Sequence, residues 1–175
     1  MSSGYQNNIS IKEAIDHIDR QEYLLPSIQR KFVWSASQIE TLFDSIMRGY
    51  PINSFMFWHI QDADIKKDFK FYKFLSAYRE FFQVNNPDFD AIGCPDFFAV
   101  IDGQQRLTSL YLGLKGTYAY KMPRKWWADN EDALPTRRLY LNLNSGLSND
   151  SDNDLDLAYD FRFLTEDEYK RNQDN

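Results

Sequence analysis

The stretch AVIDGQQRLTSLYLGLKG, residues 99–116, constrains the fold most, because a strand and a helix follow each other there with one short polar turn between them. The apolar run over residues 97–101 predicts a buried strand. Apolar residues then recur at helical spacing, and they are Leu107, Leu110, Tyr111 and Leu114. Gly116 is expected to end the helix. This segment favours a fold in which helices and strands are mixed.

Capping boxes predict the start of two further helices. In such a box a serine side chain accepts from an amide of the first turn, and a Glu or Gln three residues later bonds back. One box begins at Ser10, and overlapping boxes begin at Ser35 and Ser37. Gly49 is expected to end the second helix. Apolar residues at helical spacing predict another helix over 68–84.

Four other segments are extended or alternate apolar with polar residues, and they predict strands over 22–28, 54–60, 139–143 and 159–163. Segment 54–60 is apolar enough for a buried strand. Pro26 indicates that the first strand lies at a sheet edge or contains a bulge. Because the gaps between elements are irregular, we expect an α+β (mixed α/β) domain, a small mixed sheet with flanking helices, and not a doubly wound sheet.

The length of 175 residues and a hydrophobic content of 43% predict one ordinary domain with a sizeable core. We expect residues 1–9 to be a flexible N-terminus and residues 10–166 to be the domain. Residues 167–175 are expected to be a polar tail leading to an absent C-terminal region. Residues 144–156 are rich in Asp, Asn and Ser, which predicts a mobile loop.

Composition excludes several kinds of protein. The net charge of -6 argues against a protein that coats nucleic acid by bulk electrostatics. A single cysteine excludes an internal disulfide and any cysteine-rich zinc site. No apolar run is long enough to cross a membrane, and the first residues do not form a secretion signal. We therefore expect a soluble protein of the cytoplasm.

The polar turn Asp102-Gly103-Gln104-Gln105-Arg106 lies at the start of a predicted helix, where backbone amides favour an anion. Asp102 can cap the helix itself, with Gln105 as its capping-box partner. Arg106 is not explained by a cap, because a cation in the first turn opposes the helix dipole. A bound phosphate would reverse that effect, and Gly103 would let it approach the backbone. An ion pair between Arg106 and a neighbouring carboxylate is the structural alternative.

A second polar break, Gln29-Arg30-Lys31, also lies between a predicted strand and a capped helix. Because phosphates usually need more than one cation, Arg30 is a candidate second clamp. The alternative is that Arg30 and Lys31 are solvated loop charges. Trp34 is expected to pack on the following helix.

The segment 121–127 and the pair Arg137-Arg138 combine cations with aromatic rings. Such clusters suit single-stranded nucleic acid or a flipped base. We favour the alternative, in which two Trp rings pin a long loop and its charges are solvated.

Several of these segments together resemble the N-terminal domain of GmrSD-type restriction endonucleases. The resemblance depends on their order and spacing: residues 26–34 (PSIQRKFVW), 38–46, 49–52 and 101–109 (IDGQQRLTS). It extends over about residues 8–165. The family implies a ParB/sulfiredoxin-like fold, in which a Gly-x-x-Arg turn at a helix start binds nucleotide phosphates. Residues 103–106 coincide with that turn.

The resemblance implies binding and hydrolysis of a nucleoside triphosphate with Mg²⁺, in a protein that defends bacteria against phages. It also implies a C-terminal HNH-type nuclease domain or subunit acting on DNA. The two histidines, His17 and His59, form no such motif here, so nuclease activity is expected only in a missing part.

We assign the roles in triphosphate binding as hypotheses. Gly103 and the amides after it hold phosphate, and Arg106 and Arg30 neutralise charge that grows on phosphate oxygens. Asp102 binds Mg²⁺ or caps the helix. Gln104 or Gln105 orients the attacking water. Gln29 contacts phosphate or bridges the backbone.

Two other functions remain open. One is a non-enzymatic DNA-binding or sensing module that uses the same arginines on DNA phosphates, which the acidic net charge disfavours. The other is a protein-interaction domain whose polar turn is only a helix cap.

Overall fold

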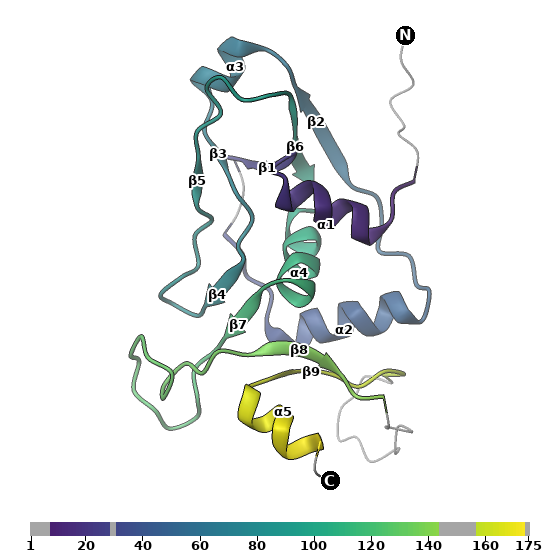
Figure 1. Cartoon of the computed structure of the whole chain (residues 1–175), viewed down its shortest axis with the longest axis vertical. Coiled ribbons are helices and arrows are strands. Elements are labelled where there is room, and N and C mark those ends of the chain that lie inside the picture. Colours follow the sequence, from purple (N-terminus) through teal and green to yellow (C-terminus); the bar gives the residue numbers. More distant parts are fainter. Residues whose placement is uncertain (1–7, 29–30, 144–156, 174–175) are drawn as a thin grey trace. The chain divides into compact units, whose positions relative to one another are not determined.

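The computed structural model describes residues 8–28, 31–143 and 157–173. It contains both helices and mixed sheets, so the predicted α+β class is confirmed. The ParB/sulfiredoxin-like assignment stays a prediction. Clustering of the chain divides it into two compact units, and each is described by itself (Figure 1). No helix among the described residues is long and apolar enough to cross a membrane.

The first unit comprises residues 1–29, 55–74 and 87–104 and is built around a five-stranded sheet. The strand order is β2-β6-β1-β3-β5 (Figure 1). The strands are β1 (Tyr23–Pro26), β2 (Met56–Ile60), β3 (Phe71–Tyr72), β5 (Asp88–Phe89) and β6 (Phe97–Asp102). Strands β1 and β6 are parallel, and the other neighbours are antiparallel. This is the small mixed sheet that the sequence predicted.

Apolar side chains from four of the strands form the core of the first unit. They include Leu24, Ile60, Phe71, Phe97 and Ala99, all buried. Helix α1 (Ile11–Asp19) has the Ser10–Glu13 capping box that the sequence predicted, and it buries Ala14, Ile15 and Ile18. A short helix, α3 (Ala63–Asp68), begins at Asp62, whose carboxylate accepts from two amides of its first turn.

The second unit comprises residues 30–54, 75–86 and 105–175. Its helices are α2 (Ala36–Met47), α4 (Gln104–Leu114) and α5 (Glu166–Gln173), and α4 begins at the last residue of the first unit. Its strands are β4 (Ala77–Arg79), β7 (Thr117–Ala119), β8 (Arg138–Leu141) and β9 (Phe161–Leu164). Strands β4 and β7 form a parallel pair, and β8 and β9 form an antiparallel pair.

Helix α2 begins with the predicted capping box: Ser35 accepts from the amide of Gln38, whose side chain accepts from the amide of Ser35. Two carboxylates one turn apart then hold the segment around β9. Asp44 accepts from the amides of Ala158 and Tyr159, both at 2.8 Å, and Glu40 accepts from the amide of Phe163 at 2.8 Å. Burial raises the pKa of Glu40, and the amide of Phe163 partly offsets this effect.

Close approach explains why two residues near the end of α4 are glycines. A Cβ atom on Gly113 would lie 2.5 Å from the ring of Phe43, and one on Gly116 would lie 2.5 Å from the carbonyl oxygen of Ser76. A larger residue at 113 would push Phe43 aside, and one at 116 would collide with backbone.

The helix predicted over 68–84 is wrong. The segment contains β3 and β4, and its turn over 79–83 is closed by hydrogen bonds between Arg79 and Gln83. Its apolar residues have a spacing compatible with a helix, but their rings pack in separate places. Phe71 lies against Phe97 in the first unit, whereas Tyr78 stacks on Tyr118 in the second.

Three further predictions differ from the structure. Pro26 is the last residue of β1, which lies in the middle of the sheet and not at its edge. At this end position the missing amide hydrogen of proline does not interrupt the hydrogen bonds between the strands. Strand β2 is a sheet edge with mostly exposed side chains, not a buried strand. Helix α5 forms where a tail was expected, with acidic residues in its first turn and basic ones in its last. The loop predicted over 144–156 lies outside the described residues.

Candidate functional site

The turn between β6 and α4 has the strand–glycine–helix geometry that the sequence predicted. Strand β6 ends at Asp102, which pairs with Met56 in the sheet and is exposed. Gly103 has a φ of 85°, a left-handed conformation that favours glycine, and it is buried. Helix α4 begins at the next residue. A chain with any side chain at 103 would be strained at this point.

Gln104 folds back onto the strand that precedes it. Its side-chain amide group donates to the carbonyl oxygen of Val100 at 2.7 Å. The bond fixes the side chain of Gln104 at the end of β6 through its nitrogen atom.

Gln105 uses both polar atoms of its side chain on one segment of backbone. Its oxygen accepts from the amide of Val33, and its nitrogen donates to the carbonyl of Lys31, both at 3.1 Å. This two-point contact holds residues 31–33 in place ahead of α2. Gln105 therefore has a positioning role that its spacing from Asp102 did not reveal.

Arg106 holds another distant segment, the connection between α2 and β2. Its guanidinium donates to the carbonyl oxygens of Ile52 and Ser54, the second at 3.0 Å. Both acceptors are backbone carbonyls, and these contacts orient the guanidinium. These two contacts could not be inferred from the local sequence.

The structure gives no contacts for two of the predicted phosphate-binding residues and no cluster of metal ligands among the described residues. Gln29 and Arg30 lie outside the described residues. Among the residues that are described, no group of three or more His, Cys, Asp or Glu side chains is arranged to hold a metal ion. Asp102 thus remains a single candidate ligand for Mg²⁺, which takes one or two protein carboxylates and completes its shell with water and phosphate oxygens.

A shallow pocket of 390 Å³ lies along α2, and its residues are Trp34, Ser37, Gln38, Thr41, Leu42 and Ser45. Its polar groups are used within the helix. Thr41 donates to the carbonyl of Ser37, Ser45 donates to that of Thr41, and Gln38 belongs to the capping box. A pocket lined by such groups offers a ligand little to bind.

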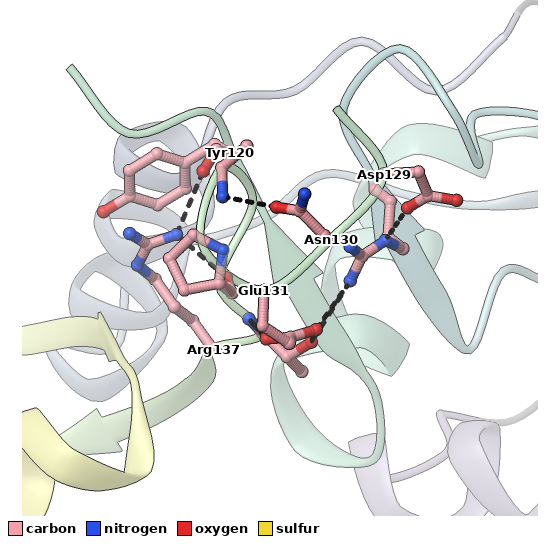
Figure 2. A network of polar contacts seen from close by, with 9 residues as sticks. Tyr120, Asp129, Asn130, Glu131 and Arg137 are labelled. Carbon is pink, nitrogen blue, oxygen red and sulfur yellow. Dashed lines mark hydrogen bonds and ion pairs between the residues drawn. The ribbon is translucent and has the colours of Figure 1, made fainter. Parts of the chain in front are cut away.

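The two arginines of the predicted basic–aromatic cluster, Arg137 and Arg138, differ in burial. Arg137 is buried, donates to the carbonyls of Tyr120 and Pro135, and lies 3.8 Å from the centre of the Tyr120 ring (Figure 2). Arg138 is exposed on β8. The buried guanidinium of Arg137 is therefore structural. The favoured alternative, with packed Trp rings and solvated charges, is wrong for both rings and for Arg137, because Arg137 is buried and Trp126 and Trp127 are exposed.

Sequence reasoning missed Arg79, which forms two ion pairs with the loop over 129–131. Its guanidinium pairs with Asp129 at 2.8 Å and with Glu131 at 3.0 Å (Figure 2). The partners are about fifty residues away along the chain. The signal that could have found it is the excess of carboxylates over 129–132, which needs a cation from another segment.

The fold and the turn define a class: an α+β domain in which an arginine follows a left-handed glycine at the start of a helix. The sequence matches the family described as GmrSD restriction endonuclease, N-terminal domain, over residues 11–175, and the chain belongs to that family. The resemblance inferred from the motifs is therefore confirmed. Membership supports a role in restriction and phage defence. No curated protein matches the sequence.

Proposed function

We propose that this domain binds a nucleoside triphosphate with Mg²⁺, and hydrolyses it, as the regulatory part of a DNA restriction protein. The phosphates bind at the turn over residues 102–106. The observation that carries the proposal is the left-handed glycine between β6 and α4, followed by an arginine in the first helical turn. A helix N-terminus reached through a glycine is suited to phosphate.

The side chains of the turn support this assignment of roles. Gln105 is occupied with residues 31–33, so its role is to position that segment. Gln104 uses only its nitrogen on Val100, so its oxygen is the better candidate to orient an attacking water. Arg106 donates to the carbonyls of Ile52 and Ser54, which orient its guanidinium, and supplies positive charge at a fixed position.

Asp102 is the proposed ligand of Mg²⁺, and Arg30 and Gln29 are proposed to contact the phosphates from the other polar break. The proposed partner is an HNH-type nuclease domain or subunit on the C-terminal side, with DNA as the target of the whole protein. We propose that the protein acts in the cytoplasm, where triphosphates and phage DNA meet.

Calorimetric titration with ATP and GTP, each with Mg²⁺, tests the proposal. We expect the chain to bind at least one of them, and Arg106→Lys to weaken binding about tenfold or more, because lysine loses the two-point grip on phosphate. Arg20→Ala is the matched control, since it removes an exposed arginine at the end of α1.

Two results would overturn the proposal: no binding of either triphosphate, or equal binding by the folded Arg106→Lys variant and the parent. A duplex DNA titration in parallel tests the alternative function. If Arg106→Lys weakens duplex binding and no triphosphate binds, the arginine acts on DNA phosphates.

A further inference from the structure

Three aromatic rings form an exposed cluster in the second unit, which we call the aromatic platform: Phe81, Phe82 and Trp127. The centroid of the Phe81 ring lies 5.5 Å from that of Trp127 and 5.3 Å from that of Phe82. Phe81 is 72% exposed and Trp127 is 48% exposed. The neighbouring Trp126 is 92% exposed. Water-facing aromatic surface of this kind marks an interaction site.

The backbone of Phe81 is in a strained conformation. Phe81 is at the tip of the turn over 79–83 and has a φ of 71°, a left-handed conformation that a bulky side chain rarely adopts. Glycine would relieve this strain. A turn that needed only to reverse the chain would not require a phenylalanine there, so the ring itself is the useful part.

Ion pairs join the two segments that carry the aromatic platform. The ion pairs of Arg79 with Asp129 and Glu131 join the turn of Phe81 to the loop that follows Trp127 (Figure 2). The carboxylate of Glu131 also accepts from the amide and the hydroxyl of Thr136. The two segments that carry the rings are therefore joined before a ligand arrives, which lowers the entropy lost on binding.

Positive charge accompanies the rings. The Nζ atom of Lys121 lies 5.6 Å from the centroid of the Trp127 ring, and Arg124 and Lys125 are exposed on the same loop. Lys125 also pairs with Asp132 at 2.7 Å. Residues 79–82 and 121–137 contain five cations and four carboxylates, whereas the whole chain has a net charge of -6. One of the five cations, Arg137, is buried, and Arg79 and Lys125 pair with carboxylates, so the cations offered beside the rings are Lys121 and Arg124.

We infer that the aromatic platform binds an unpaired base of single-stranded DNA. The base stacks against Phe81 and Trp127, and the strand's phosphates lie toward Lys121 and Arg124. Stacking accepts any base because each has a π-face, and nearby cations attract the backbone. Lys121 at the Trp127 ring and the exposed Arg124 favour an anionic strand over an apolar protein surface. This surface is separate in sequence from the turn over 102–106 and does not depend on the triphosphate proposal.

Fluorescence anisotropy of labelled oligothymidylate with the whole chain tests the inference. Phe81→Gly removes the ring and suits the left-handed backbone, so a loss of binding cannot be attributed to strain. We expect Phe81→Gly and Trp127→Ala each to weaken binding about tenfold. Raised salt is expected to weaken binding by the parent chain as well.

Trp58→Ala is the matched control, because Trp58 and Phe69 form an exposed aromatic pair in the first unit. It should leave oligothymidylate binding unchanged, and Phe81→Gly should leave triphosphate binding unchanged. The inference is overturned if the strand does not bind, if Trp58→Ala weakens binding as much as Phe81→Gly, or if duplex DNA binds as tightly. Light scattering that shows a dimer lost in Phe81→Gly, without strand binding, would assign the platform to a second copy of the chain.

Discussion

Helices α2 and α4 begin in different ways. The first turn of α2 is capped from within, because Ser35 and Gln38 bond to each other's amides across three residues. In α4 the side chains of the first turn reach far along the chain, Gln105 over more than seventy residues and Arg106 over more than fifty. A self-capped helix start serves the helix alone. The start of α4 instead holds two other segments of the second unit, residues 31–33 and the connection around residues 52–54.

The largest expected effect is that of Arg106→Ala. It leaves the carbonyls of Ile52 and Ser54 without their charged donor, which should lower the free energy of unfolding by about 2 kcal/mol. Triphosphate binding should fall by about 2 kcal/mol as well. Urea denaturation and calorimetry measure the two effects, and a fall in stability alone would leave Arg106 with a structural role only.

Asp44→Ala should have the next largest effect, on stability alone. The buried carboxylate accepts from two amides at 2.8 Å, and the variant leaves these amides without their acceptor. We expect this loss to lower the free energy of unfolding by about 2 kcal/mol. Triphosphate affinity of the folded variant should not change, because α2 serves the fold. A changed affinity would break the contrast between the two helices. Urea denaturation and the same titration measure both quantities.

Ser35→Ala and Asp102→Asn form a pair that sharpens the contrast. Ser35→Ala removes a cap and should cost about 1 kcal/mol in unfolding free energy, with no effect on triphosphate binding. Asp102 is the last residue of β6, with Gly103 between it and α4, and Asp102→Asn removes its charge while keeping the size of the side chain. If Asp102 binds Mg²⁺, however, the variant should weaken Mg²⁺-dependent binding. Equal binding by Asp102→Asn and the parent would exclude Asp102 as a ligand of Mg²⁺.

The smallest expected effect is the pH dependence due to Glu40. Its pKa is raised in the folded chain by burial, so the folded state holds the proton to higher pH than the unfolded state. Stability should therefore fall as pH rises above about 4.5, and Glu40→Gln should remove that part of the fall. The measurement is the difference in unfolding free energy between the parent and Glu40→Gln across this range. A constant difference would contradict the assignment.

The features that were predicted correctly depend on residues that are close together in the sequence. The capping boxes at Ser10 and Ser35 and the glycine turn at 103 are local patterns, and the structure contains all three. The strand over 97–101 and the helix after it are likewise present. In each case the physical cause lies within a few residues, so the pattern is enough.

The failures depend on distant partners. The aromatic spacing over 68–84 is compatible with a helix, and only the separate packing of Phe71 and Tyr78 makes it two strands. The partners of Gln105 and Arg106 are backbone groups, which no spacing of side chains identifies. The charge network of Arg79 was missed for a related reason: the carboxylates over 129–132 indicate that a cation is needed, but the sequence does not identify Arg79, about fifty residues away, as that cation.

The two-point contact of Gln105 has a mechanical consequence. An amide group that grips a backbone segment at both its donor and its acceptor resists rotation as well as translation, so Lys31–Val33 must follow any movement of the first turn of α4. The carbonyl of Trp34, next along the chain, is held by the hydroxyl of Tyr118 at 2.8 Å. Displacement of the α4 turn would thus be felt as torsion between these two anchors, immediately ahead of α2.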